Sequence, residues 1–363
     1  MEKASVEFTG KVVVLDTIVF ELQRFGGISS IWEKILEGVM AASDIEAVIL
    51  YSPEVSEKLK QIAGDRCSRT LNEVGPPLIR RFTSPQLPRN TQVYHSSYFR
   101  VAKRGNVQNV VTVHDCILEK SALGVKSLIH RFIKWRALRN ACSVICVSEN
   151  TKCDLMYHYP WLNADSIHVV HNGIDLTFFS PKSSLDHENY LLFVGSRRNY
   201  KNFPLALKLL SSQWATDNDL NLVVVGGGDF SPGELKEIGE LGLSDRVKNL
   251  GSQNREQLRD LYQSAYALIY PSFYEGFGLP PIEAMACGCP VLCSNTSSLP
   301  EVVGDAALMF DPLNLEQAIN AAKNLSDEIV RERIRHAGID RASRFSCAAM
   351  VENTLQVYRL LLR

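Results

Sequence analysis

The sequence has no excess of positive charge, because its 39 lysines and arginines are balanced by 40 aspartates and glutamates. Nonspecific nucleic-acid binding depends on basic side chains that neutralise phosphates, so we expect no nucleic-acid partner. The chain also lacks an apolar run near the roughly 18 residues of a membrane span, and its start, MEKASVEFTGKVVVLD, lacks the apolar region of a signal peptide. We therefore expect a cytoplasmic protein that reaches the inner face of the membrane only by docking on its surface.

Paired cysteine spacing is absent as well. The nine cysteines are an odd number, and they lie in apolar or helical stretches such as ACSVICVS (141–148) and ACGCPVLCS (286–294). We predict reduced, buried thiols without a zinc site. Asp217 and Asp219 precede an apolar strand instead of closing one, which favours a hydrated turn over a metal site. We predict no metal and no cofactor.

The 363 residues exceed one ordinary core and favour two domains with a cleft between them. Short β-branched runs alternate with helical patterns, which is typical of helices covering a parallel sheet. We therefore predict an α/β fold of two Rossmann-like, doubly wound domains, 1–182 and 183–345, followed by a last helix over 346–363. The strand runs are 11–16, 46–51, 109–115, 143–148 and 167–173 before the polar stretch 180–189, and YLLFVG, LNLVVVGGG, RVKNLG, YALIYPS, PVLCSN and ALMFD after it.

The stretch YEGFGLPPIEAMACGCPV (274–291) places Glu275 and Glu283 around two glycines and two prolines. The prolines suit the first turn of a helix, whose free amides favour an anion such as a diphosphate. Carboxylates accept hydrogen bonds from hydroxyl-rich groups such as a hexose or a ribose. The alternative is a helix cap with a solvated glutamate. The residues expected to offer backbone amides here are Gly276, Phe277, Gly278 and Leu279.

Three cations follow the first strand of the second half, in FVGSRRNYKNF (193–203). Arg197 and Lys201 could neutralise a leaving diphosphate, and Arg198 could take the role assigned to Arg197. Ordinary surface basic residues are the alternative.

Two motifs in the first half also follow strands. His114 and Asp115 end the strand in VTVHD, where His114 either faces the sugar or caps the strand, and Asp115 is a candidate on the acceptor side. Gly26 and Gly27 precede an apolar helical pattern, where they either let amides approach a phosphate or sugar or form a helix-entry turn.

The stretch VKSLIHRFIKWRALRNA (125–141) carries Lys126, Arg131, Lys134, Arg136 and Arg139 among apolar residues and contains no acid. Such a segment can lie on anionic lipid as a peripheral membrane contact. A helix packed between strands with a solvated basic face is the alternative.

These residues together resemble glycosyltransferase family 4, whose members are retaining enzymes of the GT-B fold. The resemblance is carried through most of the chain by GGIS, YHSSYF, VHD, VSENTKCDL, VVHNGID, VGSRRNYKNF, YPSFYEGFGLPPIEAMACGCPV and SLPEVVGDAALMFDP. It implies that Glu275 contacts the donor sugar and Glu283 the ribose, while the amides between them hold sugar and phosphate. It further implies that Arg197 and Lys201 bind the diphosphate, that His114 lies beside the sugar, and that Gly26 and Gly27 lie over the phosphates.

The resemblance also implies an activity and a division of labour. The N-terminal domain would serve the acceptor, the second domain would bind the nucleotide sugar, and the last helix would pack back on the N-terminal domain. We expect a metal-independent hexosyl transfer to a glycan or lipid-diphosphate-linked acceptor in polysaccharide biosynthesis, with GDP-mannose as the favoured donor. A UDP-hexose-dependent transferase, a nucleotide-sugar epimerase of the same architecture, a glycoside hydrolase and a binding-only protein remain alternatives.

Overall fold

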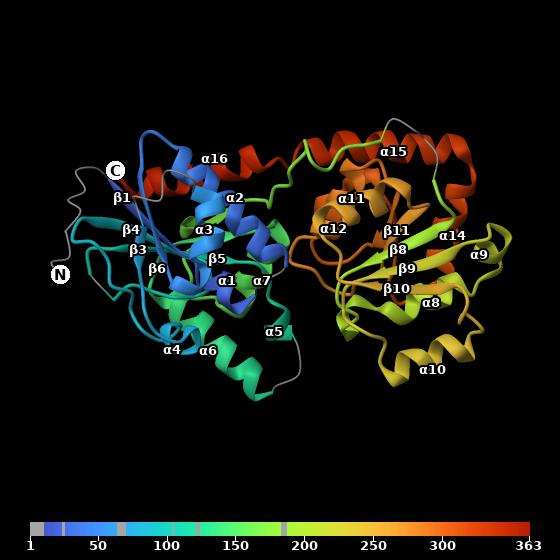
Figure 1. Ribbon diagram of the computed structural model, residues 1–363, viewed down its shortest axis with the longest axis horizontal. Helices are drawn as coiled ribbons and strands as arrows, with labels where there is room; N and C mark the ends of the chain where they lie inside the picture. The colour runs from blue at the N-terminus through green and yellow to red at the C-terminus, as the bar shows by residue number, and fades with distance from the viewer. Residues whose placement is uncertain (1–10, 24–25, 64–69, 104, 121–123, 183–186) are drawn as a thin grey trace. The chain divides into compact units, whose positions relative to one another are not determined.

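The computed structural model describes residues 11–23, 26–63, 70–103, 105–120, 124–182 and 187–363. The chain forms two units, of which unit 1 comprises Met1–Gly173 with Cys347–Arg363 and unit 2 comprises Ile174–Ser346. Each unit is built on a parallel sheet with helices packed around it (Figure 1). Within the described ranges, no helix combines the length and the apolarity needed to cross a bilayer.

The sheet of unit 1 has seven strands in the order β3-β2-β1-β4-β5-β6-β7. Strand β1 lies between β2 and β4, so the strand order reverses there, and in such sheets ligands bind outside the carboxyl ends of the strands at this point. The strands are β1 (Val12–Asp16), β2 (Glu46–Tyr51), β3 (Thr70–Asn72), β4 (Thr91–Ser96), β5 (Gln108–Val113), β6 (Ala141–Cys146) and β7 (Ile167–Val169).

The last helix of the chain packs within unit 1, where it lies against α2. The two helices approach so closely that a Cβ on Gly38 would lie 2.4 Å from Val351 Cγ1, which explains a glycine inside a helix. The helices of unit 1 are α1 (Ile18–Leu22), α2 (Gly27–Ala41), α3 (Ser56–Ala63), α4 (Pro77–Arg80), α5 (Ile117–Lys120), α6 (Val125–Arg139), α7 (Glu149–His158) and α16 (Cys347–Leu361), with short 3₁₀ turns at Pro53–Val55 and Ala164–Ser166.

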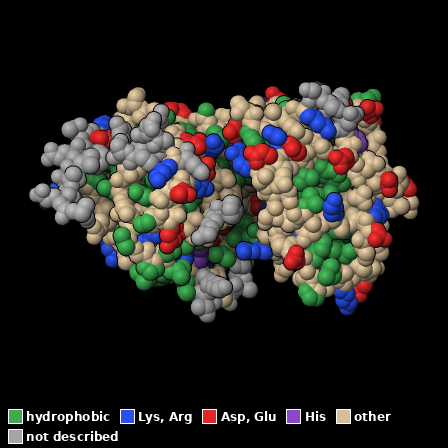
Figure 2. All heavy atoms as spheres, viewed as in Figure 1, with side chains coloured by type: hydrophobic (Ala, Val, Ile, Leu, Met, Phe, Trp, Pro, Cys, Tyr) green, Lys and Arg blue, Asp and Glu red, His purple; other side chains and the backbone are tan. Residues whose placement is uncertain are grey.

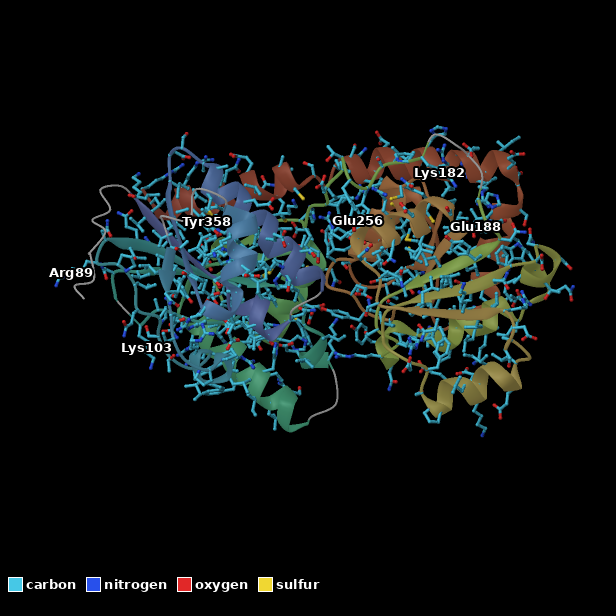
Figure 3. All side chains as sticks on the ribbon, viewed as in Figure 1. Arg89, Lys103, Lys182, Glu188, Glu256 and Tyr358 are labelled. Carbon is cyan, nitrogen blue, oxygen red and sulfur yellow. The ribbon has the colours of Figure 1, made fainter. Side chains whose placement is uncertain are left out.

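A buried histidine connects this last helix to the sheet. His95 on β4 has its Nδ1 2.5 Å from the hydroxyl of Tyr358 on α16 (Figure 3) and its Nε2 2.8 Å from Thr112 Oγ1 on β5. Trp32 on α2 packs edge-on against the same imidazole. Burial, reinforced by the neighbouring His114, lowers the pKa of His95 to about 3. The imidazole is therefore neutral in the folded protein.

We expect unit 1 to lose stability in acid because of this histidine. Below its ordinary pKa of 6.5 the unfolded chain binds a proton that folded His95 does not take up until about pH 3, so stability falls as the pH falls through this window. The contribution between pH 7.5 and pH 5 is about 2 kcal/mol. Hydrogen exchange of the β1 and β4 amides should show a smaller pH dependence in His95→Gln, whereas the exposed control His336→Gln should keep it. An unchanged dependence in His95→Gln would contradict the assignment.

The sheet of unit 2 has six strands in the order β10-β9-β8-β11-β12-β13, and its reversal lies at β8, between β9 and β11. Leu191, Phe193, Leu222 and Ile269 are among the apolar side chains of its core. The strands are β8 (Tyr190–Val194), β9 (Asn221–Val225), β10 (Val247–Gly251), β11 (Ala267–Tyr270), β12 (Val291–Ser294) and β13 (Leu308–Phe310). The helices are α8 (Phe203–Leu210), α9 (Gln213–Asp217), α10 (Pro232–Glu240), α11 (Arg255–Ser264), α12 (Leu279–Ala286), α13 (Leu299–Val303), α14 (Leu315–Lys323) and α15 (Glu328–Ser343), with 3₁₀ turns at Asn199–Lys201, Gly304–Ala306 and Asn324–Ser326.

The structure confirms two doubly wound α/β units, with a strand near each predicted run, and it adds β3 and β4. The first unit ends at Gly173 instead of the expected residue 182. The reason is that the amide of Ile174 donates to the carbonyl of Phe345 at 2.8 Å, and Phe179 packs on Tyr262, so this segment belongs to unit 2. Of the polar stretch 180–189, residues 187–189 are exposed in unit 2, and residues 183–186 lie outside the described ranges.

Candidate functional site

The loop between β11 and α12 presents backbone donors at the point where the strand order of unit 2 reverses. Gly278 is the N-cap of α12 with φ +109°, and a Cβ there would lie 2.9 Å from Leu299 Cδ2, so the position requires glycine. No side chain caps this helix, and prolines occupy its first turn. Pro280 and Pro281 carry no N–H, so the amides of Gly278 and Leu279 are the donors that an anion can use at this helix start.

Two serines from the next loop hold this backbone in place. The amide of Glu275 donates to Ser297 Oγ at 2.9 Å, and Ser298 Oγ donates to the carbonyls of Glu275 and Phe277 at 3.0 and 2.9 Å. Both serines follow β12, the strand next to β11. The loop of the site is thus fixed by side chains that the sequence reasoning did not single out.

Lys201 and Glu275 meet in this site. The ammonium of Lys201 lies 2.7 Å from Glu275 Oε1 and donates at 2.7 Å to the hydroxyl of Tyr270, the last residue of β11. Burial opposes the charge of Lys201, but Tyr270 and Glu275 outweigh it and raise its pKa. Since an ammonium has three donors, one remains for an incoming anion. The contact joins the loops that follow two neighbouring strands, β8 and β11.

Glu283 lies one turn inside α12 and has its own partner. Its Oε2 accepts from the hydroxyl of Tyr262 on α11 at 2.9 Å, and burial raises the pKa of Glu283, with Tyr262 and Arg255 opposing. Arg255 in turn lies 4.4 Å from the ring centre of Phe178. No hydrogen bond from the described part of the chain reaches Glu283 Oε1, so this oxygen can accept from hydroxyl groups of a ligand.

The side chain of Arg197 forms an ion pair and hydrogen bonds within the protein. Its guanidinium pairs with Glu234 at 2.7 Å and donates to the carbonyls of Gly226, Gly228 and Asp229 at 2.9, 3.0 and 2.6 Å. This side chain therefore clamps the glycine-rich loop after β9. Arg198 is exposed, and its side chain makes no hydrogen bond or ion pair with the described residues. Of the two arginines, Arg198 is the one available for a ligand.

The remaining predicted residues lie in unit 1. Gly26 and Gly27 form the entry to α2, and no side chain caps this helix either. His114 and Asp115 follow β5, and Asp115 Oδ1 accepts from the amide of Ile117 at 3.0 Å. Burial lowers the pKa of His114 to about 4, with Asp115 opposing and Lys134 reinforcing the shift. His114 is therefore a neutral imidazole at physiological pH.

A buried lysine, which the sequence placed on a solvated or lipid-facing surface, supports this loop. Lys134 is 0% exposed, and its ammonium donates to the carbonyl of Asp115 at 2.7 Å and pairs with Glu119 at 3.0 Å. Glu119 also accepts from the hydroxyl of Tyr159 at 2.8 Å. The surface interpretation of Lys134 is wrong because the carboxylate of Glu119 and the carbonyl of Asp115, both inside unit 1, compensate its burial. The network anchors the backbone next to His114.

Comparison with known proteins defines the class of this architecture. Residues 177–341 match the family described as glycosyl transferases group 1, and residues 48–178 match glycosyltransferase family 4. Among solved structures, Anabaena Alr3699/HepE in complex with UDP-glucose superposes with a TM-score of 0.73 at 18% identity, over 97% of this chain and 99% of that one. The two units thus form the GT-B fold. The chain belongs to glycosyltransferase family 4.

Two curated relatives are similar over part of their length. The O-antigen chain mannosyltransferase B of Escherichia coli is 33% identical over 62% of this chain and 62% of its own. The O-antigen chain mannosyltransferase RfbU of Salmonella typhimurium is 31% identical over 55% of this chain and 56% of its own. The aligned region therefore spans less than two thirds of either relative.

Proposed function

We propose that this protein is a retaining glycosyltransferase that moves a hexose from a nucleotide sugar to a glycan or lipid-linked acceptor in polysaccharide biosynthesis. The observation that carries the proposal is the contact of Lys201 with Glu275 beside the uncapped start of α12. It places a cation, a carboxylate and the backbone amides of an uncapped helix start together where the strand order reverses. A diphosphate joined to a sugar matches this set of groups.

The proposed mechanism depends on charge. A nucleoside diphosphate is a good leaving group once the charge that grows on its β-phosphate is stabilised, which Lys201, Arg198 and the amides of Gly276, Phe277, Gly278 and Leu279 can do without a metal. Glu275 orients the sugar and stabilises its developing positive charge. Glu283 holds the ribose through its free oxygen, and the leaving phosphate helps to deprotonate the acceptor in a front-face attack that retains configuration.

In unit 1, we propose that His114 contacts the sugar as a neutral hydrogen-bonding group and that Asp115 lies on the acceptor side. The amides at Gly26 and Gly27 would approach the phosphates. The lowered pKa of His114 supports hydrogen bonding over charge in this role.

GDP-mannose is our proposed donor, supported by the names of the two O-antigen mannosyltransferases. A UDP-hexose is the second candidate, supported by the UDP-glucose bound to the structural relative. We infer that the reaction takes place in the cytoplasm, because the eight cysteines in the described part of the chain form no disulfide and five of them are buried, as expected for a reducing compartment. The buried five are Cys116, Cys146, Cys287, Cys289 and Cys293, whereas Cys142 and Cys153 are exposed, against the prediction that all thiols are buried.

A panel of nucleotide sugars, with the products separated into free nucleotide, epimerised donor and transferred sugar, tests the proposal. We expect release of GDP from GDP-mannose together with transfer, and we expect the activity to survive EDTA. Accumulation of an epimer would instead identify an epimerase, and loss of activity on chelation with rescue by magnesium would contradict the metal-independent mechanism. Binding without turnover of any donor would identify a binding-only protein.

Substitutions of the two arginines after β8 should have different effects, one on the transfer rate and the other on stability. Arg198→Ala should lower the transfer rate by about tenfold without changing stability, because its exposed side chain forms no hydrogen bond or ion pair with the residues that the structure describes. Arg197→Ala should lower the free energy of unfolding of unit 2 by about 2–4 kcal/mol, because Glu234 and several carbonyls lose their charged donor. Steady-state kinetics and urea unfolding measure the two effects, with Arg198→Lys as the charge-conserving control. A large loss of transfer rate in a stable Arg197→Ala protein, with normal activity in Arg198→Ala, would indicate that Arg197 binds the diphosphate.

A further inference from the structure

Two short segments of unit 1 expose large apolar side chains. On α4 and its flanks, Leu78 and Ile79 are 64% and 60% exposed, and on α6 Phe132 and Trp135 are 54% and 42% exposed. On α6 these side chains recur at helical spacing and thus share one face. Together they form what we call the α4–α6 surface, made of Val74, Leu78, Ile79, Phe82, Leu128, Ile129, Phe132 and Trp135.

The two segments form one continuous surface. Arg136 in the last turn of α6 donates to the carbonyls of Phe82 and Arg81, at 2.7 and 2.8 Å, so the residues that follow α4 are joined directly to α6. Phe132 and Trp135 also stack on each other, with ring centres 6.0 Å apart. In Figure 2, hydrophobic side chains gather over the region that α4 and α6 occupy in Figure 1. An apolar area of this kind on one face marks an interaction site.

The two stretches of sequence that form this surface contain basic but no acidic residues. The sequence contains no aspartate or glutamate in 74–90 or 124–140, while Arg81, Arg131 and Arg139 flank the apolar side chains. The nearest acids in the chain are already neutralised, because Glu73 pairs with Arg100 at 2.6 Å and Glu119 is buried against Lys134. The surface therefore combines exposed aromatic and aliphatic groups with arginines that form no ion pair with the described residues.

We propose that the α4–α6 surface docks this protein on a bilayer rich in anionic phospholipid. Arginines attract the anionic headgroups, and Phe132 and Trp135 enter the interface, where amphipathic aromatic side chains are favoured. The proposal goes beyond the transfer reaction. The proposal also changes the membrane-contact hypothesis for residues 125–141. Lys134 is buried and does not contact lipid, and the side chain of Lys126 lies outside what the structure describes. Helix α4 adds a second row of apolar side chains.

Cosedimentation of the full chain with vesicles of equal parts phosphatidylglycerol and phosphatidylcholine tests the electrostatic part. Arg131→Glu combined with Arg139→Glu should weaken binding at least tenfold, and raised salt should weaken the unchanged protein. Arg333→Glu combined with Lys236→Glu alters net charge equally on unit 2, where both side chains are exposed, and should leave binding intact. Equal binding to pure phosphatidylcholine vesicles would overturn the proposal.

A second pair of variants tests the apolar part without changing charge. Phe132→Ser combined with Trp135→Ser should also weaken vesicle binding at least tenfold, whereas Leu313→Ser combined with Ile329→Ser, at exposed positions of unit 2, should not. Donor hydrolysis without acceptor should stay unchanged in all four variants, which separates this proposal from the proposed function. If the α6 variants instead dissociated a dimer in sedimentation and bound vesicles normally, the surface would be a self-association interface and the membrane proposal would be wrong.

Discussion

Replacing Lys201 with methionine should lower the rate of sugar transfer by about a hundredfold to a thousandfold, the scale of a lost stabiliser of developing charge. Lys201 is the buried cation of the candidate site, and its ammonium lies 2.7 Å from Glu275. Methionine fills similar space without charge, so the effect reports the lost interaction with the diphosphate. Steady-state kinetics with the donor, in the presence of acceptor, gives the rate.

Loss of Lys201 also leaves Glu275 without its cation, so the measurement needs controls for stability. Lys208→Met makes the same change at an exposed position seven residues further along and should keep full activity. Tyr270→Phe removes the hydroxyl that holds the ammonium but leaves the ion pair, and should reduce the rate by about tenfold or less. A folded Lys201→Met protein with nearly normal turnover would remove Lys201 from the mechanism.

The elements of the fold that could be predicted from the sequence are those whose own residues show a characteristic hydrophobic pattern. Buried parallel strands are continuous apolar runs, so β1, β2 and β8 are recognisable without partners. Strand β4 was missed because its sequence, TQVYHS, is polar, although it lies at the centre of the sheet. Its buried polar groups are satisfied by distant partners, as His95 is by Tyr358, 263 residues away. Such compensation has no local signal.

The candidate site shows the same limit. Residues that follow strands could be named from the sequence, because the carboxyl ends of parallel strands meet at one edge of a sheet. The sequence does not reveal which of the two adjacent arginines is available to a ligand, because Arg197 is bound by Glu234, 37 residues away. Lys134 likewise belongs to a basic, apolar stretch whose sequence is typical of an exposed helix face. Its burial depends on Glu119 and the carbonyl of Asp115, which the local sequence does not identify as its partners.

Substitutions of the two glutamates of the α12 region should have different effects on binding and catalysis, because the two carboxylates lie at different distances from the sugar in the proposed mode of binding. Glu283→Ala should weaken binding of GDP and of GDP-mannose alike by about 1–3 kcal/mol, as expected when hydrogen bonds to a charged group are lost. Glu283 is held by Tyr262, so Tyr262→Phe should reproduce a fraction of this loss by releasing the carboxylate. Isothermal calorimetry with both ligands measures the change.

Glu275→Gln should instead bind GDP normally and lower kcat with the intact donor by about a hundredfold. The amide keeps an oxygen that can accept from Lys201, and the backbone of residue 275 stays bonded to Ser297 and Ser298, so only the negative charge is lost. Charge matters at this position only when positive charge develops on the sugar, which is why kcat falls and nucleotide affinity does not. Loss of GDP affinity in Glu275→Gln, with normal affinity in Glu283→Ala, would reverse the proposed orientation of the donor. A glycosyl group trapped covalently on another carboxylate in Glu275→Gln would exclude the front-face mechanism and show a double displacement in its place.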